Sequence, residues 1–114
     1  MLVIAQLIAL TTVPTEMDPA LEQYGACISG RIEARQGEIV RRPSRARDVI
    51  GSIQRACATV RGDALAAADE ALSSLPSFQD KAARKAFVAD RFNERDAYLA
   101  NMFDGSAFAE KVDQ

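Results

Sequence analysis

Cys27 and Cys57 are the residues of this chain with the widest chemical repertoire. Two thiols can form a disulfide, contribute to a metal site or supply a thiolate nucleophile. They form no C-x-x-C motif and the chain has no histidine, so Cys and His cannot provide the four ligands of a structural zinc site. We expect one disulfide between neighbouring helices if the protein is exported, and two small buried apolar side chains if it is cytosolic.

Arginine is concentrated in the middle of the chain. Residues 31–61 hold eight arginines and three acidic residues, although the whole chain has a formal net charge of −2. Backbone N–H groups at a helix N-terminus also attract anions, so arginines beside one predict a site for an acidic partner. The alternative is a solvated turn whose arginines pair with acidic residues elsewhere in the chain. The candidate residues lie where a connector meets the next helix: Arg41, Arg42, Arg45 and Arg47.

Other patterns that carry chemistry are missing from the sequence. The chain contains no G-x-x-x-x-G-K-[ST] or G-x-G-x-x-G phosphate-binding loop and no G-x-S-x-G nucleophile motif. Without histidine, no Ser-His or Cys-His pair can form. Asp90 and Glu94 share a helical face, but no calcium-loop pattern accompanies them. We therefore predict a protein that is not an enzyme and that binds neither cofactor nor metal.

The elements that must position these residues are helices. Apolar residues recur at three-to-four spacing along most of the chain, and no β-type alternation appears outside a short connector at 38–43. Short connections between helices are typical of antiparallel neighbours. The sequence therefore predicts an all-α fold, a small antiparallel bundle with three main helices over about 18–36, 45–74 and 78–104.

Glycine and alanine positions refine these boundaries. Gly37 is expected to cap the first helix at its C-terminus. The second helix is predicted to run continuously through Gly62, with a break at Gly62-Asp63 as the alternative. The alanine-rich stretch 64–71 permits close helix approach, and we expect it to pack against the phenylalanine-bearing third helix.

The first 17 residues allow two interpretations. Leu2 to Leu10 are apolar except for Gln6, a run of the length found in the apolar core of a signal peptide, although no lysine or arginine precedes it. Residues 1–17 are interpreted as a signal peptide or, alternatively, as an apolar segment or short helix docked on a single helical domain of residues 18–114. The run is shorter than the roughly 20 residues of a membrane-spanning helix, so no integral span is expected.

Composition bounds the class of protein further. A chain of 114 residues with 48% hydrophobic and 26% charged residues suits one globular domain rather than a disordered protein. Alanine supplies 21 of the hydrophobic residues, so much of the core consists of small side chains. Such a core is modest for a lone domain, which favours a helix-to-helix disulfide or a partner that covers one face.

Two functional hypotheses follow from these observations. The first is a non-enzymatic helical protein that is exported to the periplasm or secreted, is stapled by a Cys27–Cys57 disulfide, and acts through a protein partner or self-association. The second is a cytoplasmic regulatory or adaptor bundle whose Arg41–Arg47 patch binds an acidic partner or nucleic acid. Nucleic acid is disfavoured, because the chain is acidic and the patch lacks interleaved aromatic residues for base stacking.

Overall fold

Helices make up almost all of the chain between residues 13 and 103, the residues that the computed structural model describes. No strand occurs among them, and the all-α prediction is confirmed. The described helices, with single-turn 3-10 helices named η, are η1 (Thr15–Met17), α2 (Asp18–Ala34), α3 (Gln36–Arg41), η2 (Pro43–Arg45), α4 (Ala46–Ala56), α5 (Ala58–Leu72), η3 (Pro76–Phe78) and α6 (Lys81–Met102).

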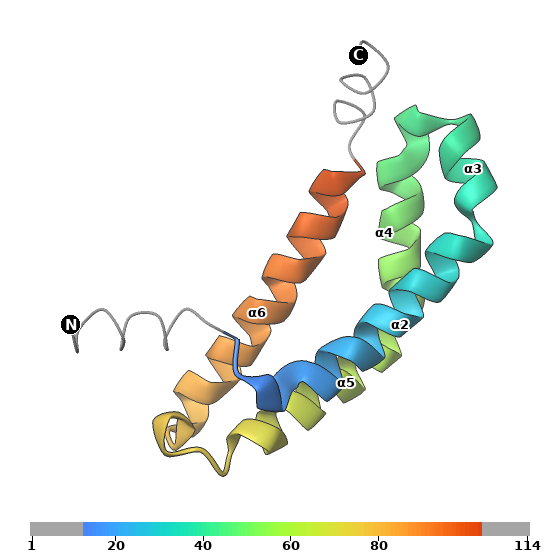
Figure 1. Cartoon of the computed structure of the whole chain (residues 1–114). Coiled ribbons are helices and arrows are strands. Elements are labelled where there is room, and N and C mark those ends of the chain that lie inside the picture. The colour runs from blue at the N-terminus through green and yellow to red at the C-terminus, as the bar shows by residue number, and fades with distance from the viewer. Residues whose placement is uncertain (1–12, 104–114) are drawn as a thin grey trace.

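Helix α5 lies at the centre of the arrangement. It packs along α2 and against α6, and η1 also rests on it. Helix α6 contacts α4 as well, so it spans the junction between α4 and α5. Figure 1 shows α2 and α6 running apart from one another toward the α3 end of the molecule. The two helices that flank α5 are therefore separated along part of their length.

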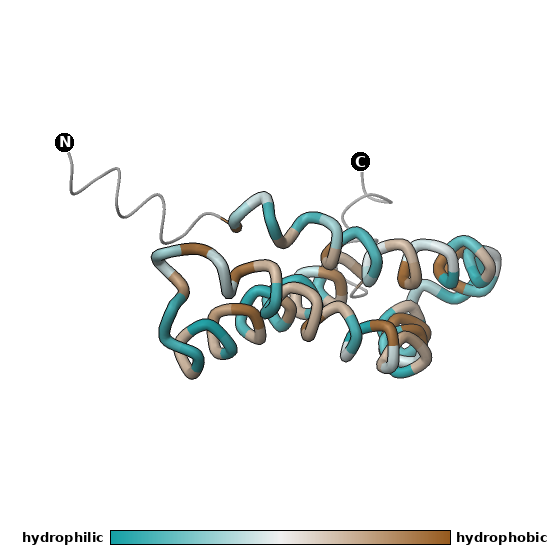
Figure 2. Tube along the Cα trace, turned by 90° about the horizontal axis from the view of Figure 1, so that it is seen from below, coloured by the Kyte–Doolittle hydropathy of each residue, from teal (hydrophilic) through white to brown (hydrophobic). Residues whose placement is uncertain are grey.

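The core consists of apolar residues that recur along the helices, and Figure 2 shows hydrophobic positions alternating with hydrophilic ones along the Cα trace. Ala64 and Ala68 are fully buried one turn apart on α5, and Phe92 of α6 is also fully buried. The alanine-rich helix thus packs against α6, as expected, and against α2 as well. The buried residues are Met17, Ala20, Leu21, Tyr24, Ile28, Ile39, Ala46, Val49, Ile50, Ile53, Cys57, Ala64, Ala68, Leu72, Val88 and Phe92.

The first predicted helix is divided near its end. Helix α2 stops at Ala34, Arg35 leaves helical geometry at φ −112° and ψ 14°, and the separate helix α3 follows. Gly37 lies inside α3 without a positive φ, so its prediction as a C-terminal cap is wrong. Ile39 of α3 is buried, and this anchorage explains why the segment expected as a connector is helical.

The predicted helix over 45–74 is also divided, at a position that propensity did not indicate. Helix α4 ends at Ala56 and α5 begins at Ala58, whereas Gly62 lies inside α5. Cys57 has φ −95° and ψ 11°, and its carbonyl still accepts the backbone N–H of Arg61 at 2.9 Å. With these divisions, five α-helices occur in the described part of the chain rather than three.

The two interpretations of residues 1–17 fall mostly outside the described residues, because the description begins at Val13. Within it, Val13 packs against the core and Met17 is fully buried. Residues 104–114, the end of the predicted domain, also lie outside. Among the described helices, none has the length and apolarity needed to cross a membrane.

Candidate functional site

Three helices meet at the carboxylate of Asp96. The hydroxyl of Tyr24 on α2 donates to Asp96 Oδ1 at 2.6 Å, and Arg61 Nε on α5 donates to Asp96 Oδ2 at 2.9 Å. Arg61 Nη2 donates to the side-chain oxygen of Asn93 at 2.9 Å. Gln54 of α4 donates to the backbone carbonyl of Asp96 at 3.1 Å. The cluster therefore connects α2, α4 and α5 to one turn of α6.

Aromatic rings form the apolar side of this cluster. The rings of Tyr24 and Phe92 stack with centroids 5.9 Å apart, and the Arg61 guanidinium lies 5.9 Å and 5.8 Å from their centroids. Burial, followed by the hydrogen bond to Asp96, raises the pKa of Tyr24 well above its ordinary value. Arg61 acts in the opposite direction but does not reverse the shift. Tyr24 therefore acts as a neutral hydrogen-bond donor, not as a base.

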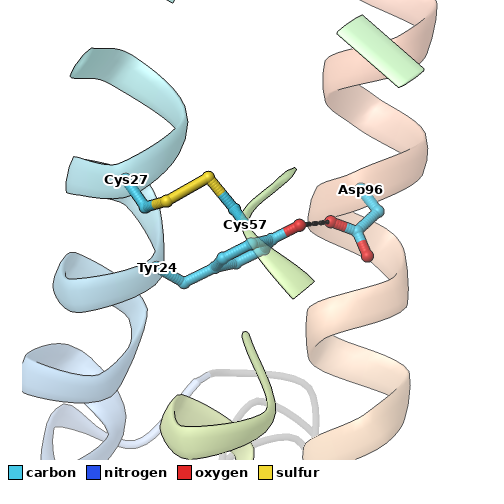
Figure 3. Close-up of a disulfide and its surroundings, with 4 residues drawn as sticks. All are labelled: Tyr24, Cys27, Cys57 and Asp96. Atoms are coloured by element: carbon cyan, nitrogen blue, oxygen red, sulfur yellow. Dashed lines mark hydrogen bonds between the residues drawn. A yellow bond between two sulfur atoms is a disulfide. The ribbon is translucent and has the colours of Figure 1, made fainter. Parts of the chain in front are cut away.

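The disulfide lies beside this cluster, as Figure 3 shows. Cys27 of α2 is bonded to Cys57 at the α4–α5 junction, with their Cα atoms 6.1 Å apart. The predicted pairing is confirmed. Both cysteines of the chain are used, so neither offers a thiolate to a substrate. Because Cys57 is fully buried, the bond fixes α2 directly onto the core.

An apolar groove opens next to the Asp96 cluster, between α2 and α6. Its volume is about 550 Å³. Leu21, Ile28 and Ile32 line the α2 wall, and Leu99 and Met102 line the α6 wall. Tyr98 also lines the groove and is 69% exposed, and Met102 is 48% exposed. The part of the chain that the structure describes therefore leaves apolar surface uncovered here, which is typical of an interaction site.

Charged residues occupy the α6 edge of the groove. Arg91 Nη2 donates to Glu94 Oε1 at 2.7 Å, and the Arg91 guanidinium lies 4.8 Å from the centroid of the Phe87 ring. Arg91 Nε is buried and finds no hydrogen-bond acceptor within residues 13–103. Arg95 lies one turn further along α6 and also lines the groove. The groove therefore has an apolar floor, and its α6 edge carries the guanidinium groups of Arg91 and Arg95 together with the carboxylate of Glu94.

The predicted arginine patch is only partly assembled. A cleft of about 310 Å³ at the α3–α4 connection is lined by Glu38, Arg41, Arg42, Arg45 and Val49. Arg47 is exposed and is not among the lining residues, so the structure brings together three of the four predicted arginines. Among the side chains described, none hydrogen-bonds to the guanidinium of Arg42 or Arg45, while Arg41 Nε donates to the carbonyl of Gly37 at 3.0 Å.

Glu38 partly neutralises this cleft. Arg35 donates to Glu38 through Nε and Nη2, each at 2.9 Å. This hydrogen-bonded pair holds the pKa of Glu38 below its usual value, and the charges of Arg41 and Arg42 act in the same direction. Glu38 is therefore negatively charged at neutral pH and already has a cationic partner.

Sequence reasoning missed the groove and the Asp96 cluster. The apolar stripes that include Tyr24 and Leu99 were visible, but the pairing of Arg61 with Asp96 joins distant positions that no local spacing connects. No group of three or more potential metal ligands occurs among residues 13–103, and Asp90 and Glu94 belong to no such group. No protein-family model, curated protein or solved structure matches the chain.

Proposed function

We propose that this protein is a non-enzymatic helical module that works outside the cytoplasm, in the periplasm or as a secreted protein, by binding a protein partner in the groove between α2 and α6. The observation that carries the proposal is the Cys27–Cys57 disulfide, because disulfides persist in oxidising compartments and small domains depend on them there. The uncovered apolar surface at Tyr98 and Met102 supports a partner at that face.

The compartment is tested on protein isolated from its own cells. Cells are fractionated and lysed in a thiol-alkylating reagent, and the intact mass of the protein is measured. We expect an unalkylated disulfide form in the extracytoplasmic fraction. A doubly alkylated form confined to the cytosol would show that the export proposal is wrong. The N-terminal residue of the isolated protein decides between the two interpretations of residues 1–17.

The second candidate function is the binding of an acidic partner at the arginine cleft. It is favoured by the convergence of Arg41, Arg42 and Arg45 on one cleft that contains a single acidic side chain. The test compares an Arg41→Ala/Arg42→Ala/Arg45→Ala variant with Arg47→Ala for retention on an anionic resin over a salt gradient. Arg47→Ala should lower the salt concentration of elution slightly. We expect the triple variant to lower it by more than three times that amount, because electrostatic attraction is stronger where several charges converge. Equal effects per arginine would contradict a specific site.

A further inference from the structure

The α6 wall of the groove presents a continuous helical face. Arg91, Arg95, Leu99 and Met102 line the groove at spacings of four, four and three residues, which places them on one side of α6. From Arg91 to Met102 this face is about 16 Å long at a rise of about 1.5 Å per residue. A helix of about three turns can lie along it, and the α2 wall supplies a second row of apolar contacts.

The charges on this face restrict what can occupy the groove. Glu94 is 66% exposed and already pairs with Arg91, and Asp96 is committed to Tyr24 and Arg61. Within the described chain, Arg95 is exposed and has no ion-pair partner, whereas Arg91 already pairs with Glu94. An occupant that covered the Arg95 guanidinium with apolar atoms alone would bury an unpaired cation, which is strongly unfavourable. The occupant must therefore bring an anionic acceptor to this edge.

From this combination we propose that the groove binds an amphipathic helix of a partner protein that carries an aspartate or glutamate facing Arg95. This inference rests on the proposed function and specifies its partner. The apolar run Leu2–Leu10 of the same chain has no acidic residue and does not meet this requirement. A second copy that docked through the same face would bring two further guanidinium groups and only carboxylates that already have partners.

The experiment uses a display library of helical peptides selected on the full-length, oxidised protein. The library keeps leucine at i, i+3, i+4 and i+7 and varies the remaining positions. We expect the selected peptides to share an acidic residue at one position beside the leucine stripe. Binding is then measured by fluorescence anisotropy with labelled peptides from the selection. Failure to enrich any peptide, or a selected set without a common acidic position, overturns the proposal.

A charge exchange locates the contact. Arg95→Glu should weaken binding about tenfold or more, and a peptide whose selected acid is replaced by lysine should recover binding to this variant. Arg47→Glu makes the same change of charge outside the groove and should leave the affinity within a factor of about two. Equal effects of Arg95→Glu and Arg47→Glu would overturn the proposed contact, because they would report only net charge.

Two further measurements exclude the other occupants. If sedimentation shows a dimer of the parent protein that Leu99→Asp converts to monomer, a second copy fills the groove and the proposal is wrong. If only a Leu7→Asp variant of the chain binds the peptides, the chain's own apolar run fills it, and the proposal is again wrong. A protein found reduced in the cytosol that still binds acidic helices contradicts export but not this inference. An exported, oxidised protein that binds none contradicts only the groove assignment.

Discussion

The hydroxyl of Tyr24 donates a 2.6 Å hydrogen bond to Asp96 across 72 positions of the chain. The same carboxylate accepts from Arg61, so one acidic side chain holds α2 and α5 against α6. Burying a hydroxyl and a guanidinium is unfavourable unless both find acceptors, and Asp96 satisfies both. Tyr24 and Asp96 also line the groove, so their hydrogen bond holds the two walls together at this point. The titration of Tyr24 and the stability of Asp96 variants report on this contact.

The first prediction concerns the titration of Tyr24. Tyr24 and Tyr98 are the only tyrosines and the chain has no tryptophan, so a Tyr98→Phe variant reports Tyr24 alone through phenolate absorbance. Because the pKa of Tyr24 is raised by burial and by Asp96, we expect its midpoint in the native protein above the value of about 10 found in unfolded chains. The same variant in denaturant supplies that reference, and coincident midpoints would contradict the hydrogen bond.

The raised pKa of Tyr24 also has a consequence for stability against pH. Above about pH 10 the unfolded chain releases the tyrosine proton while the folded protein retains it. Deprotonation therefore stabilises the unfolded state relative to the folded state. The contribution of Tyr24 is therefore fully present below about pH 10 and is lost as the pH rises through the folded-state pKa. When denaturant unfolding is measured at increasing pH, the free energy of unfolding should fall more steeply for the unsubstituted protein than for Tyr24→Phe. Parallel curves would contradict a contribution from Tyr24.

The second prediction concerns the Arg61–Asp96 ion pair. Asp96→Ala leaves the donors of Tyr24 and Arg61 without an acceptor, and we expect it to lower the free energy of unfolding by about 1–3 kcal/mol. A double-mutant cycle with Arg61→Met should give a coupling of about 0.5–3 kcal/mol. Glu94→Ala removes a carboxylate that is 66% exposed on the same helix and is the matched control, with a smaller cost. Additive effects in the cycle would show that the two residues act independently.

The third prediction concerns the disulfide. Reduction of the Cys27–Cys57 bond should lower the free energy of unfolding by about 3–4 kcal/mol, because the open chain regains the conformational entropy of the enclosed loop. The measurement is denaturant unfolding of the same protein with and without reductant. The Cys27→Ala/Cys57→Ala variant controls for effects of the reductant and should not respond to it. A midpoint that reduction leaves unchanged would mean that the bond contributes nothing to folding.

The fourth prediction concerns Gly30, an exposed residue in the interior of α2. A methyl group added at this position has no atom within 4 Å, and the backbone has no positive φ. Gly30→Ala should therefore raise the free energy of unfolding by about 1 kcal/mol through helix propensity alone. For a chain of this size the melting temperature should rise by about 4 °C. Destabilisation would show that Gly30 meets a contact which residues 13–103 do not supply.

Local sequence patterns were sufficient for the helical class, but for the disulfide they gave only a conditional prediction, because the bond was expected only in an exported protein. The three-to-four apolar spacing predicts helices because one face of each must be buried, and the even cysteine count without competing ligands favours Cys27–Cys57. These inferences need only a few neighbouring residues or the residue inventory. Neither requires knowledge of which helices touch.

The features that escaped prediction depend on tertiary contacts. Ile39 is buried and makes α3 part of the core, although the segment around it is too short to show a helical stripe. The α4–α5 break lies at Cys57, inside the apolar stripe, while the helix continues through Gly62, on a segment that buries Ala64 and Ala68 further along despite the low propensity of glycine. The groove depends on how far α2 and α6 diverge, which spacing along either helix does not encode.

The position of Cys57 has a consequence for proteolysis. The segment between the bonded cysteines contains α3, η2 and α4, and with them the exposed residues Arg41 and Arg45. A trypsin-like cut after either arginine would leave two fragments joined through sulfur, so the nicked protein would keep its electrophoretic mobility until reductant was added. The arginine cleft thus lies on a covalent ring, and cleavage there opens the ring without releasing α2 from α5.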